Sequence, residues 1–252
     1  MYGVREWWRD MAGELAGLVL PADCAGCGLP RTGLCARCAG LLRDACTAVR
    51  RVRPHPPPRG LPAVYAALPY ADEVRAVLLA HKERGALRLA APLGSVLAAS
   101  VRAVADAAAE KAAGPGPGTG PAAADAEPLL LVPVPSARRA VALRGHDPVR
   151  RVALAAAGEL RRGGRPARVL AVLRQRRPVA DQAGLTARQR AANLAGALEV
   201  PAGAGRLAAE GPVVVVDDLV TTGASLAEAA RALSGAGGRV VGAAVVAAAA
   251  GR

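Results

Sequence analysis

Short apolar runs alternate with longer amphipathic stretches over most of the chain. Short runs rich in Val, Leu and Ala are typical of strands that are buried on both faces of a sheet. Such strands are predicted at residues 63–69, 129–134, 168–173, 213–216 and 239–247. Apolar residues at helical spacing predict helices at 72–82, 87–104, 147–160 and 226–233. The alternation of the two patterns predicts an α/β fold, with a parallel sheet flanked by helices.

The N-terminal part of the chain does not follow this alternation. Apolar residues at helical spacing predict a helix at 5–20, and a cysteine-rich segment follows it. Residues 50–62 contain five prolines and are interpreted as a linker. We therefore expect a small N-terminal unit at 1–60 and a main domain at 61–252. Residues 106–127 are dominated by Ala, Gly and Pro, and we expect a loop-like insert there.

Positive charge dominates the chain, which has a formal net charge of +13 over its 252 residues. Lysine occurs at only two positions and Phe is absent, so the composition reflects a strong bias towards Ala, Arg, Gly and Pro. The excess is concentrated at residues 138–190, where 14 arginines face three acidic residues, a net charge of +11. A solvated basic face and an anion-binding surface both explain such a segment, and the composition alone leaves both open.

No apolar run in the sequence resembles a membrane span. Residues 15–20 are too short, and they lack the basic leading region and the cleavage site of a signal peptide. Residues 240–250 are also short for a bilayer and are better interpreted as a buried strand. We therefore expect a cytoplasmic protein without membrane insertion. The paired Cys-x-x-Cys units agree, because in a cytosolic chain they indicate metal binding more than disulfides.

The segment 213–225 carries the most specific pattern in the chain: four Val, two Asp, Leu-Val, and then Thr-Thr-Gly-Ala-Ser. The valines predict a buried strand, and Asp217 and Asp218 stand at its C-terminal end, where open α/β sheets form ligand crevices. The hydroxyls and free N–H groups at the start of the next helix form a cradle for an anion. An acidic pair beside such a cradle suits a ligand with both hydroxyls and a phosphate, as in a ribose 5-phosphate. The alternative is a strand, an acidic turn and a capped helix that bind no ligand.

This segment resembles the phosphoribosyl pyrophosphate signature of the type I phosphoribosyltransferases along its whole length. In that family two acidic residues hold the 2′- and 3′-hydroxyls of the ribose, and the Thr-rich loop holds the 5′-phosphate. The resemblance implies a type I phosphoribosyltransferase-like parallel sheet flanked by helices, and a catalytic, ribose-binding role for Asp217 and Asp218. It also implies contacts to the ribose and its 5′-phosphate from Thr221, Thr222, Gly223, Ala224 and Ser225.

Further motifs make the chain resemble the ComF family (competence protein F). Their order is the N-terminal cysteine cluster, residues 82–85, the strand and turn at 131–136, and the arginine-rich segments that end at Leu194. The family usually has Arg-Gly-Phe-Asn-Gln where this chain has Arg144-Gly-His-Asp-Pro. The insert at 106–127 is also an addition to the family pattern.

The resemblance further implies that pyrophosphate lies against the turn after the first core strand. The implied contacts are Ser136, Arg138, Arg139 and Arg144, and guanidinium groups suit this ligand because they pair bidentately with phosphate oxygens. Residues 174–190 are interpreted as a loop that closes over the substrate. The implied reaction displaces pyrophosphate from C1 of the ribose by a nitrogen nucleophile, with Mg²⁺ and arginine neutralising the leaving group. No residue is an evident general base.

Two Cys-x-x-Cys pairs, Cys24 with Cys27 and Cys35 with Cys38, are separated by seven residues. Four thiolates at this spacing can surround one tetrahedral Zn²⁺, and a segment too short for its own core needs such a link. The sequence therefore predicts a small zinc-ribbon-like module with structural Zn²⁺. An iron site and a redox-active dithiol pair are the alternatives. Cys46 lies outside the spacing and is expected to be an ordinary cysteine.

Two functions of different classes fit the sequence. The first is an enzyme, a phosphoribosyltransferase that binds phosphoribosyl pyrophosphate with Mg²⁺ and acts on an unidentified acceptor. The second is a non-catalytic DNA-uptake or nucleic-acid-binding factor with the same fold, whose partners would be single-stranded DNA or the competence machinery. A zinc-ribbon regulator of duplex DNA is a third interpretation. No motif in the sequence specifies the acceptor or the oligomeric state.

Overall fold

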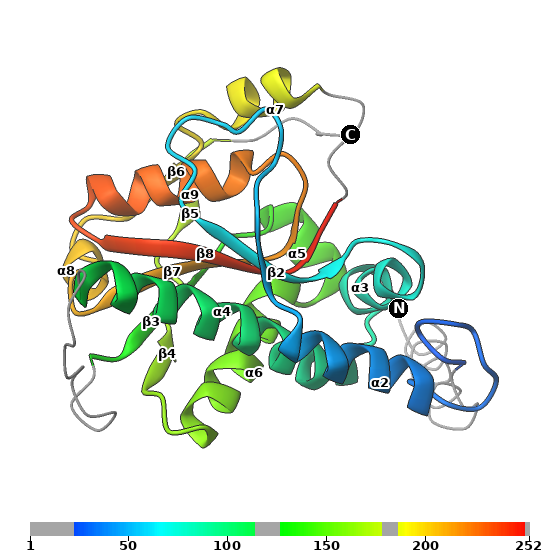
Figure 1. Ribbon diagram of the computed structural model, residues 1–252. Coiled ribbons are helices and arrows are strands. Elements are labelled where there is room, and N and C mark those ends of the chain that lie inside the picture. Colours follow the sequence, from blue (N-terminus) through cyan, green and yellow to red (C-terminus); the bar gives the residue numbers. More distant parts are fainter. Residues whose placement is uncertain (1–22, 114–126, 178–185, 250–252) are drawn as a thin grey trace, which may run out of the picture.

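The structure, a computed structural model of the chain, describes residues 23–113, 127–177 and 186–249 (Figure 1). The predicted helix at 5–20 lies outside these residues. Six strands form the central sheet, and all neighbouring pairs run parallel except the first. In spatial order they are β1 (Arg50–Val52), β2 (Val64–Pro69), β8 (Arg239–Ala248), β7 (Pro212–Val220), β3 (Leu129–Pro133) and β4 (Ala167–Val169). The predicted α/β fold is confirmed, as a mixed sheet with mostly parallel strands.

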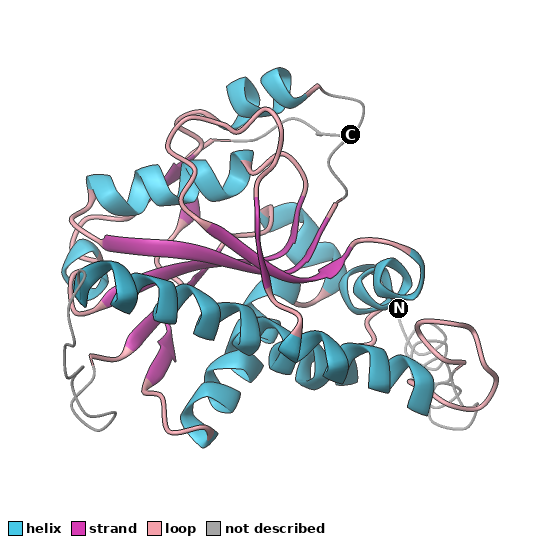
Figure 2. Ribbon diagram, viewed as in Figure 1, coloured by secondary structure: helices cyan, strands magenta, loops and turns pink. Residues whose placement is uncertain are grey.

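Helices lie on both faces of this sheet and at its edges (Figure 2). They are α2 (Ala36–Asp44), α3 (Asp72–Glu83), α4 (Ala90–Ala113), α5 (Arg138–Arg144), α6 (Pro148–Arg162), α7 (Ala187–Leu194), α8 (Gly205–Ala208) and α9 (Ala224–Gly235), with the 3-10 turns η1 (Ala45–Thr47) and η2 (Leu87–Leu89). Two further strands, β5 (Arg174–Gln175) and β6 (Leu198–Glu199), form a separate antiparallel pair.

Alternating side chains of the strands build two separate cores. Leu131 of β3 and Val216 of β7 pack with α4 and α6 on one face of the sheet. Val132 and Val215 pack with α9 on the opposite face. All four side chains are fully buried, as expected for parallel strands made of continuous apolar runs. The carboxyl ends of the parallel strands therefore meet at one edge of a sheet whose faces are closed, and β7 brings its acidic residues to this edge.

Helix α4 is longer than predicted. It continues from Ala90 to Ala113, so residues 106–113 are helical where a loop was expected, and residues 114–126 lie outside the described part. Alanine favours the helix more than any other residue, and this run of alanines extends it. Contrary to the sequence expectation, Leu87–Ala113 is long and apolar enough to cross a membrane by length and composition. Because 61% of its apolar window is buried inside the protein, this segment packs as a core helix.

The N-terminal segment contacts the main sheet in the described part of the chain. Residues 50–62, here called the strap, were expected to be a linker, but the first three form β1, an antiparallel edge strand on β2. Helix α2 packs against α4, and Leu42 of α2 is buried in the core beneath that helix. An ion pair between Arg37 of α2 and Glu73 of α3 adds a further connection. The division of the chain into two units at residue 60 stays a prediction.

A small lobe of β5, β6 and α7 lies next to α9 (Figure 1). Glu228 of α9 connects the two, because its buried carboxylate accepts a hydrogen bond from the Leu198 N–H at 3.0 Å and pairs with Arg231 at 2.7 Å. Burial opposes the charge of Glu228, but Arg231 and the Leu198 N–H outweigh it and lower its pKa. A buried carboxylate is stable only with such partners, so this contact fixes the position of the lobe.

Candidate functional site

The acidic doublet lies at the carboxyl end of β7, near the middle of the sheet. The strand runs beyond its predicted end, through Asp217 and Asp218 to Val220, because β8 pairs with it over this whole stretch. Asp217 is opposite Val245 of β8, so it is held within the ladder. Asp218 is 8% exposed, and Asp217 is also partly exposed. The sequence predicted the doublet directly after the strand, whereas it lies within β7, two residues before the strand ends.

A lysine to which the motifs assigned no role pairs with the doublet. The ammonium Nζ of Lys82, in α3, donates to Oδ2 of Asp218 at 2.9 Å. Burial opposes the charge of Lys82, but the attraction of Asp218 and Asp217 outweighs it and raises the pKa of the ammonium. The side chain of Lys82 is 34% exposed, so the ion pair borders solvent and is not enclosed in the core. Local spacing cannot reveal such a pair, because 136 residues separate its members.

Asp217 has no cationic partner within hydrogen-bonding distance in the described part of the chain. Its Oδ1 accepts a hydrogen bond from the backbone N–H of Asp218 at 2.8 Å. Burial and the neighbouring Asp218 carboxylate raise the pKa of Asp217 well above its usual value, and the charge of Lys82 opposes this with a smaller effect. Two adjacent carboxylates are unfavourable together unless a proton, a cation or hydrogen-bond donors satisfy them. The doublet therefore favours a ligand that brings donors to its open side.

The C-terminal end of α3 is fastened to the loop between α5 and α6. Arg144 donates two hydrogen bonds to Glu83, at 2.7 and 2.8 Å. Nε2 of His146 lies 3.2 Å from the carbonyl oxygen of His81, and Nε2 of His81 lies 3.3 Å from that of Pro148. Burial lowers the pKa of His81. Both imidazoles therefore belong to the contact between α3 and the α5–α6 loop. In this structure the guanidinium of Arg144 is bound by Glu83, and its predicted contact with pyrophosphate stays a prediction.

The Thr-rich turn connects β7 to α9. Gly223 stands at the N-cap of α9 with a φ of 75°, a conformation that favours glycine. A β-carbon at this position would lie 3.0 Å from Leu61 and 3.3 Å from Pro54, so the strap packs closely against the turn. Within the described residues, no hydrogen-bond acceptor is present for the backbone N–H groups of Thr221 and Thr222. The turn therefore presents unpaired donors at the positive end of a helix dipole.

The other predicted ligands of the turn lie where the helix begins. Ala224 is buried in the first turn of α9 and offers only its backbone, whereas Ser225 is half-buried. The structure therefore brings the doublet and the turn together in one continuous segment, from the carboxyl end of β7 to the first turn of α9. Whether this segment holds a ribose phosphate stays a prediction.

The predicted pyrophosphate turn follows β3, which is the neighbour of β7. The N–H of Val134 donates to the carbonyl oxygen of Val216 at 2.9 Å, which aligns the end of β3 with the doublet. Ser136 is half-buried, and Arg138 and Arg139 are exposed at the start of α5. The turn thus lies on the β3 side of the doublet, with two arginines that are exposed to solvent.

The segment predicted to close over the substrate is ordered at both of its described ends. Arg174 of β5 pairs with Glu199 of β6 at 2.7 Å. Arg177 donates to two backbone carbonyl oxygens at the end of α7, each at 2.9 Å. Residues 178–185 lie outside the described part of the chain. The prediction of a closing loop for this segment therefore stays untested.

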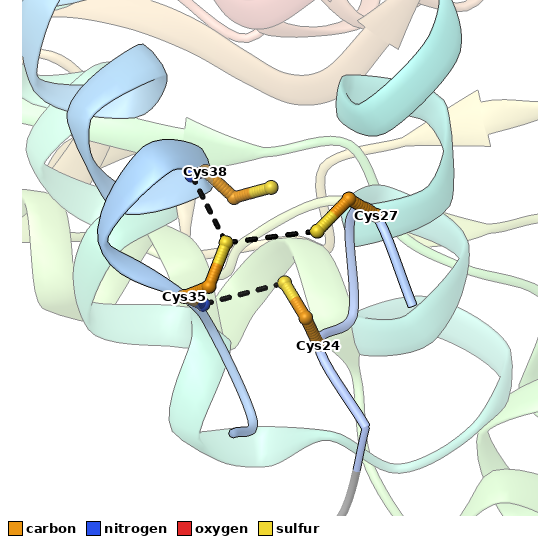
Figure 3. Close-up of side chains that lie close together, drawn as sticks. All are labelled: Cys24, Cys27, Cys35 and Cys38. Atoms are coloured by element: carbon orange, nitrogen blue, oxygen red, sulfur yellow. Dashed lines mark hydrogen bonds between the residues drawn. The ribbon is translucent and has the colours of Figure 1, made fainter. Parts of the chain in front are cut away.

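The four predicted metal ligands converge before and at the start of α2 (Figure 3). The sulfur atoms of Cys24, Cys27, Cys35 and Cys38 all lie within 4.8 Å of one another. Tetrahedral thiolate ligands of one Zn²⁺ are separated by about 3.8 Å, because the Zn–S bond is about 2.3 Å long. Cys27 is exposed and the other three are buried. This cluster has the donor set and the spacing of a structural zinc module.

Backbone N–H groups donate hydrogen bonds to sulfur atoms of this cluster, and such bonds favour the thiolate form that binds a cation. The N–H of Cys35 donates to the sulfur of Cys24 at 3.3 Å, and the N–H of Cys38 donates to the sulfur of Cys35 at 3.5 Å. Burial raises the pKa of Cys24, but backbone hydrogen bonds from Cys35, Cys27 and Gly26 outweigh it and lower the pKa to about 6. Gly26 is required by close packing, since a β-carbon there would lie 2.7 Å from the sulfur of Cys38.

Comparison with known protein families agrees with this geometry. The family model of the phosphoribosyl transferase domain matches residues 170–252. The matched range contains β5 to β8 and therefore the doublet, the Thr-rich turn and the small lobe. No curated protein matches the chain. Over these residues the chain is similar to a phosphoribosyl transferase domain, which supports a type I phosphoribosyltransferase. The chain also has a mixed, mostly parallel sheet and an N-terminal four-cysteine cluster compatible with a zinc module.

Proposed function

We propose that the protein is a phosphoribosyltransferase that binds phosphoribosyl pyrophosphate at the carboxyl end of β7. One observation carries this proposal: the acidic doublet is continuous with a turn before α9 in which the backbone N–H groups of Thr221 and Thr222 are unpaired within the described residues. Carboxylates accept hydrogen bonds from hydroxyls, and a helix N-terminus binds phosphate. A ribose 5-phosphate offers both groups.

The ion pair with Lys82 leaves room for the ribose. Lys82 engages Oδ2 of Asp218, and the Asp218 N–H engages Oδ1 of Asp217. In the described part of the chain, no protein N–H or ammonium donates to the remaining oxygen of either carboxylate. One acceptor atom on each carboxylate therefore lacks a protein N–H or ammonium donor, and these two atoms are the proposed acceptors for the 2′- and 3′-hydroxyls. The proposed role of Lys82 is to neutralise the charge of one carboxylate of the doublet. The ligand then does not have to neutralise that charge.

In the proposed reaction a nitrogen nucleophile forms a bond to C1 of the ribose while the bond from C1 to pyrophosphate breaks. The electron pair of the broken bond leaves with the pyrophosphate, and the proton of the nucleophile passes to solvent. The doublet orients the ring, and the turn after β3 offers Arg138 and Arg139 to the leaving group. Mg²⁺ bound with the pyrophosphate would neutralise its charge.

The proposal is tested by titrating phosphoribosyl pyrophosphate in the presence of Mg²⁺ and by screening nitrogen acceptors for pyrophosphate release. We expect saturable binding that requires Mg²⁺, and release with at least one acceptor. Single-stranded DNA serves as the competing ligand. Binding of DNA by a protein that does not bind phosphoribosyl pyrophosphate would reject the transferase and favour the non-catalytic alternative.

The resemblance to the ComF family supports a narrower proposal. The order of the cysteine cluster, the turn after β3 and the acidic doublet supports a ComF-like phosphoribosyltransferase, with a role in competence or DNA uptake as its biological context. Deletion of the gene in its host should then reduce uptake of added DNA. An unchanged uptake frequency would leave the transferase assignment standing and remove the narrower one.

We also infer that the four-cysteine cluster binds one structural Zn²⁺. Cys24, Cys27, Cys35 and Cys38 would hold it, and the ion would connect the segment before α2 to the start of that helix. The cluster supports structure and not chemistry, because all four ligand positions of a tetrahedral ion would be occupied by the protein. Elemental analysis of the purified chain should give one zinc per molecule.

Replacement of Lys82 should change the pH dependence of ligand binding. The charge of Lys82 lowers the pKa of Asp217, so Lys82→Met should raise that pKa further. Protonation of Asp217 removes a carboxylate from the ribose site, so affinity falls as the pH drops through its pKa. In Lys82→Met this fall should begin at a higher pH than in the wild type. Lys82→Arg keeps the charge and should retain the wild-type profile, and an identical profile in Lys82→Met would contradict the role of Lys82.

A further inference from the structure

A basic cavity borders the Thr-rich turn on the side away from the predicted pyrophosphate turn. It has a volume of about 330 Å³. One wall is formed by Thr221 and the ends of β7 and β8, and the other wall is the strap. The strap contributes Arg50, Arg51, Arg53 and His55, and no carboxylate lines the cavity.

The strap is held against the turn by packing. Pro54 is buried, and it lies with Leu61 against Gly223 at the start of α9. Figure 1 shows the strap passing beside the start of α9 before it enters β2. Residues on both sides of Pro54 therefore have a defined position beside the turn. The basic wall of the cavity is therefore a packed part of the fold and not a free tail.

The arginines of this wall are not neutralised by the protein. None of Arg50, Arg51 and Arg53 forms an ion pair in the described part of the chain, although ion pairs engage many arginines elsewhere. Like charges around one small cavity repel each other, and an anion placed among them is attracted by all of them. Guanidinium groups pair bidentately with carboxylate and phosphate oxygens. The cavity therefore has the chemistry of an anion site.

The order of strands in the sheet shows on which side of the doublet the cavity lies. Strand β7 lies between β8 and β3. The predicted pyrophosphate turn follows β3, whereas the cavity is bordered by Ala248 and Ala249 at the end of β8. A nucleophile that displaces a leaving group in line approaches C1 from the opposite side. With the ribose on the doublet of β7, the incoming acceptor therefore approaches from the side of β8, where the cavity lies.

We propose that this cavity binds an anionic group of the acceptor, so that the acceptor is a nitrogen nucleophile that carries a carboxylate or a phosphate. The inference rests on the proposed function and deepens it by naming the class of the second substrate. The acceptor nitrogen bonds to C1 as the bond from C1 to pyrophosphate breaks, and the electron pair leaves with pyrophosphate. An acceptor nitrogen that carries a proton, as in orotate or an amine, loses it to solvent, whereas a pyridine nitrogen, as in nicotinate, has no proton and becomes positively charged. The anionic group on the acceptor remains unchanged.

The test compares acceptors that differ by one anionic group. The pairs are orotate with uracil, nicotinate with nicotinamide, and phosphoethanolamine with ethanolamine, and the first two distinguish carboxylate from the phosphate of the third. Pyrophosphate release should occur with the anionic member of at least one pair and be at least about tenfold slower with its neutral counterpart. Equal rates within every pair would overturn the proposal.

Variants of the strap identify the residues that bind the anionic group. Arg51→Ala combined with Arg53→Ala should lower kcat/KM for the anionic acceptor about 10- to 100-fold, because charge-assisted hydrogen bonds are lost. The affinity for phosphoribosyl pyrophosphate should stay within about twofold of the wild type. Replacing both residues by Lys keeps the charge and should restore part of the activity. Arg59→Ala is the matched control, since Arg59 is an exposed arginine of the same strap that does not line this cavity.

Two outcomes separate this inference from the proposed function. If the double variant loses phosphoribosyl pyrophosphate affinity as strongly as acceptor activity, the cavity belongs to that ligand and the acceptor proposal is overturned. If the wild type binds no phosphoribosyl pyrophosphate, the proposed function fails. NMR titration with orotate, nicotinate and phosphoethanolamine then tests whether the cavity binds an anion. Binding that disappears in the double variant supports the site, and absence of binding to the wild type overturns it.

Discussion

Replacing both carboxylates, Asp217→Asn with Asp218→Asn, should weaken binding of phosphoribosyl pyrophosphate by a factor on the order of 100 or more. A hydrogen bond to a charged group contributes about 1.5–3 kcal/mol, and each carboxylate has one acceptor atom open to a ribose hydroxyl. Loss of two such bonds corresponds to about two to four powers of ten in the dissociation constant. The measurement is a titration with Mg²⁺ at a pH where Asp217 is ionised in the wild type.

The same variant should not unfold in the absence of ligand. The pKa of Asp217 is raised in the folded chain, so above that pKa its ionised form costs folding free energy, and an amide removes this cost. Lys82 loses its partner, but its side chain is 34% exposed and water covers part of the charge. The Tm of the free variant should therefore be close to or above that of the wild type at neutral pH. The rise in Tm that the ligand produces in the wild type should be absent.

Asp106→Asn is the matched control for this change of charge. Asp106 is an exposed aspartate of α4, and its replacement should leave both the affinity and the ligand-induced rise in Tm unchanged. If the double variant bound phosphoribosyl pyrophosphate with wild-type affinity, the doublet would not be the ribose site, and the anion cradle alone would have to account for binding.

The doublet and its turn were predictable because their signal is local. A run of valines, two acidic residues and a glycine before a helix occupy one continuous segment, so periodicity and turn chemistry locate them without knowledge of the fold. The four cysteines were predictable for the same reason, since each ligand pair lies within one short segment. The structure brings the four sulfur atoms within 4.8 Å of one another, and this clustering is compatible with a metal site at the predicted cysteines.

Contacts between distant segments were not predictable from the sequence. Lys82 and Asp218 are 136 residues apart, and Arg144 and Glu83 are 61 residues apart. Neither pair has a local signature, because each depends on how α3 lies at the end of the sheet. The basic cavity has the same origin. Its arginines belong to a proline-rich segment whose composition indicates a linker, and only its packing against Gly223 makes it a wall of the crevice.

The second large effect is expected at the cysteine cluster, where Cys38→Ser should release the metal and unfold the segment before α2. Cys38 is 2% exposed, and Cys35 caps the same helix by accepting a hydrogen bond from the Cys38 N–H. Structural zinc contributes on the order of 10 kcal/mol in small zinc modules, far more than the few buried side chains of this segment can supply. Zinc content should fall to near zero. Hydrogen exchange should show lost protection over residues 23–44, while β7 and β8 remain protected.

Cys46→Ser is the control, because Cys46 is a cysteine near the cluster that is not among its ligands. Its sulfur donates to the carbonyl oxygen of Leu42 at 3.6 Å, a bond that a serine hydroxyl can replace, so this variant should keep its zinc. Full zinc occupancy in Cys38→Ser would contradict a four-cysteine site. Iron in the purified wild type would instead give visible absorbance, and redox-active dithiol pairs would give free thiols without bound metal. The metal and thiol content of the wild type therefore decides among the three chemistries that the spacing of these cysteines allows, and the two variants show which cysteines are ligands.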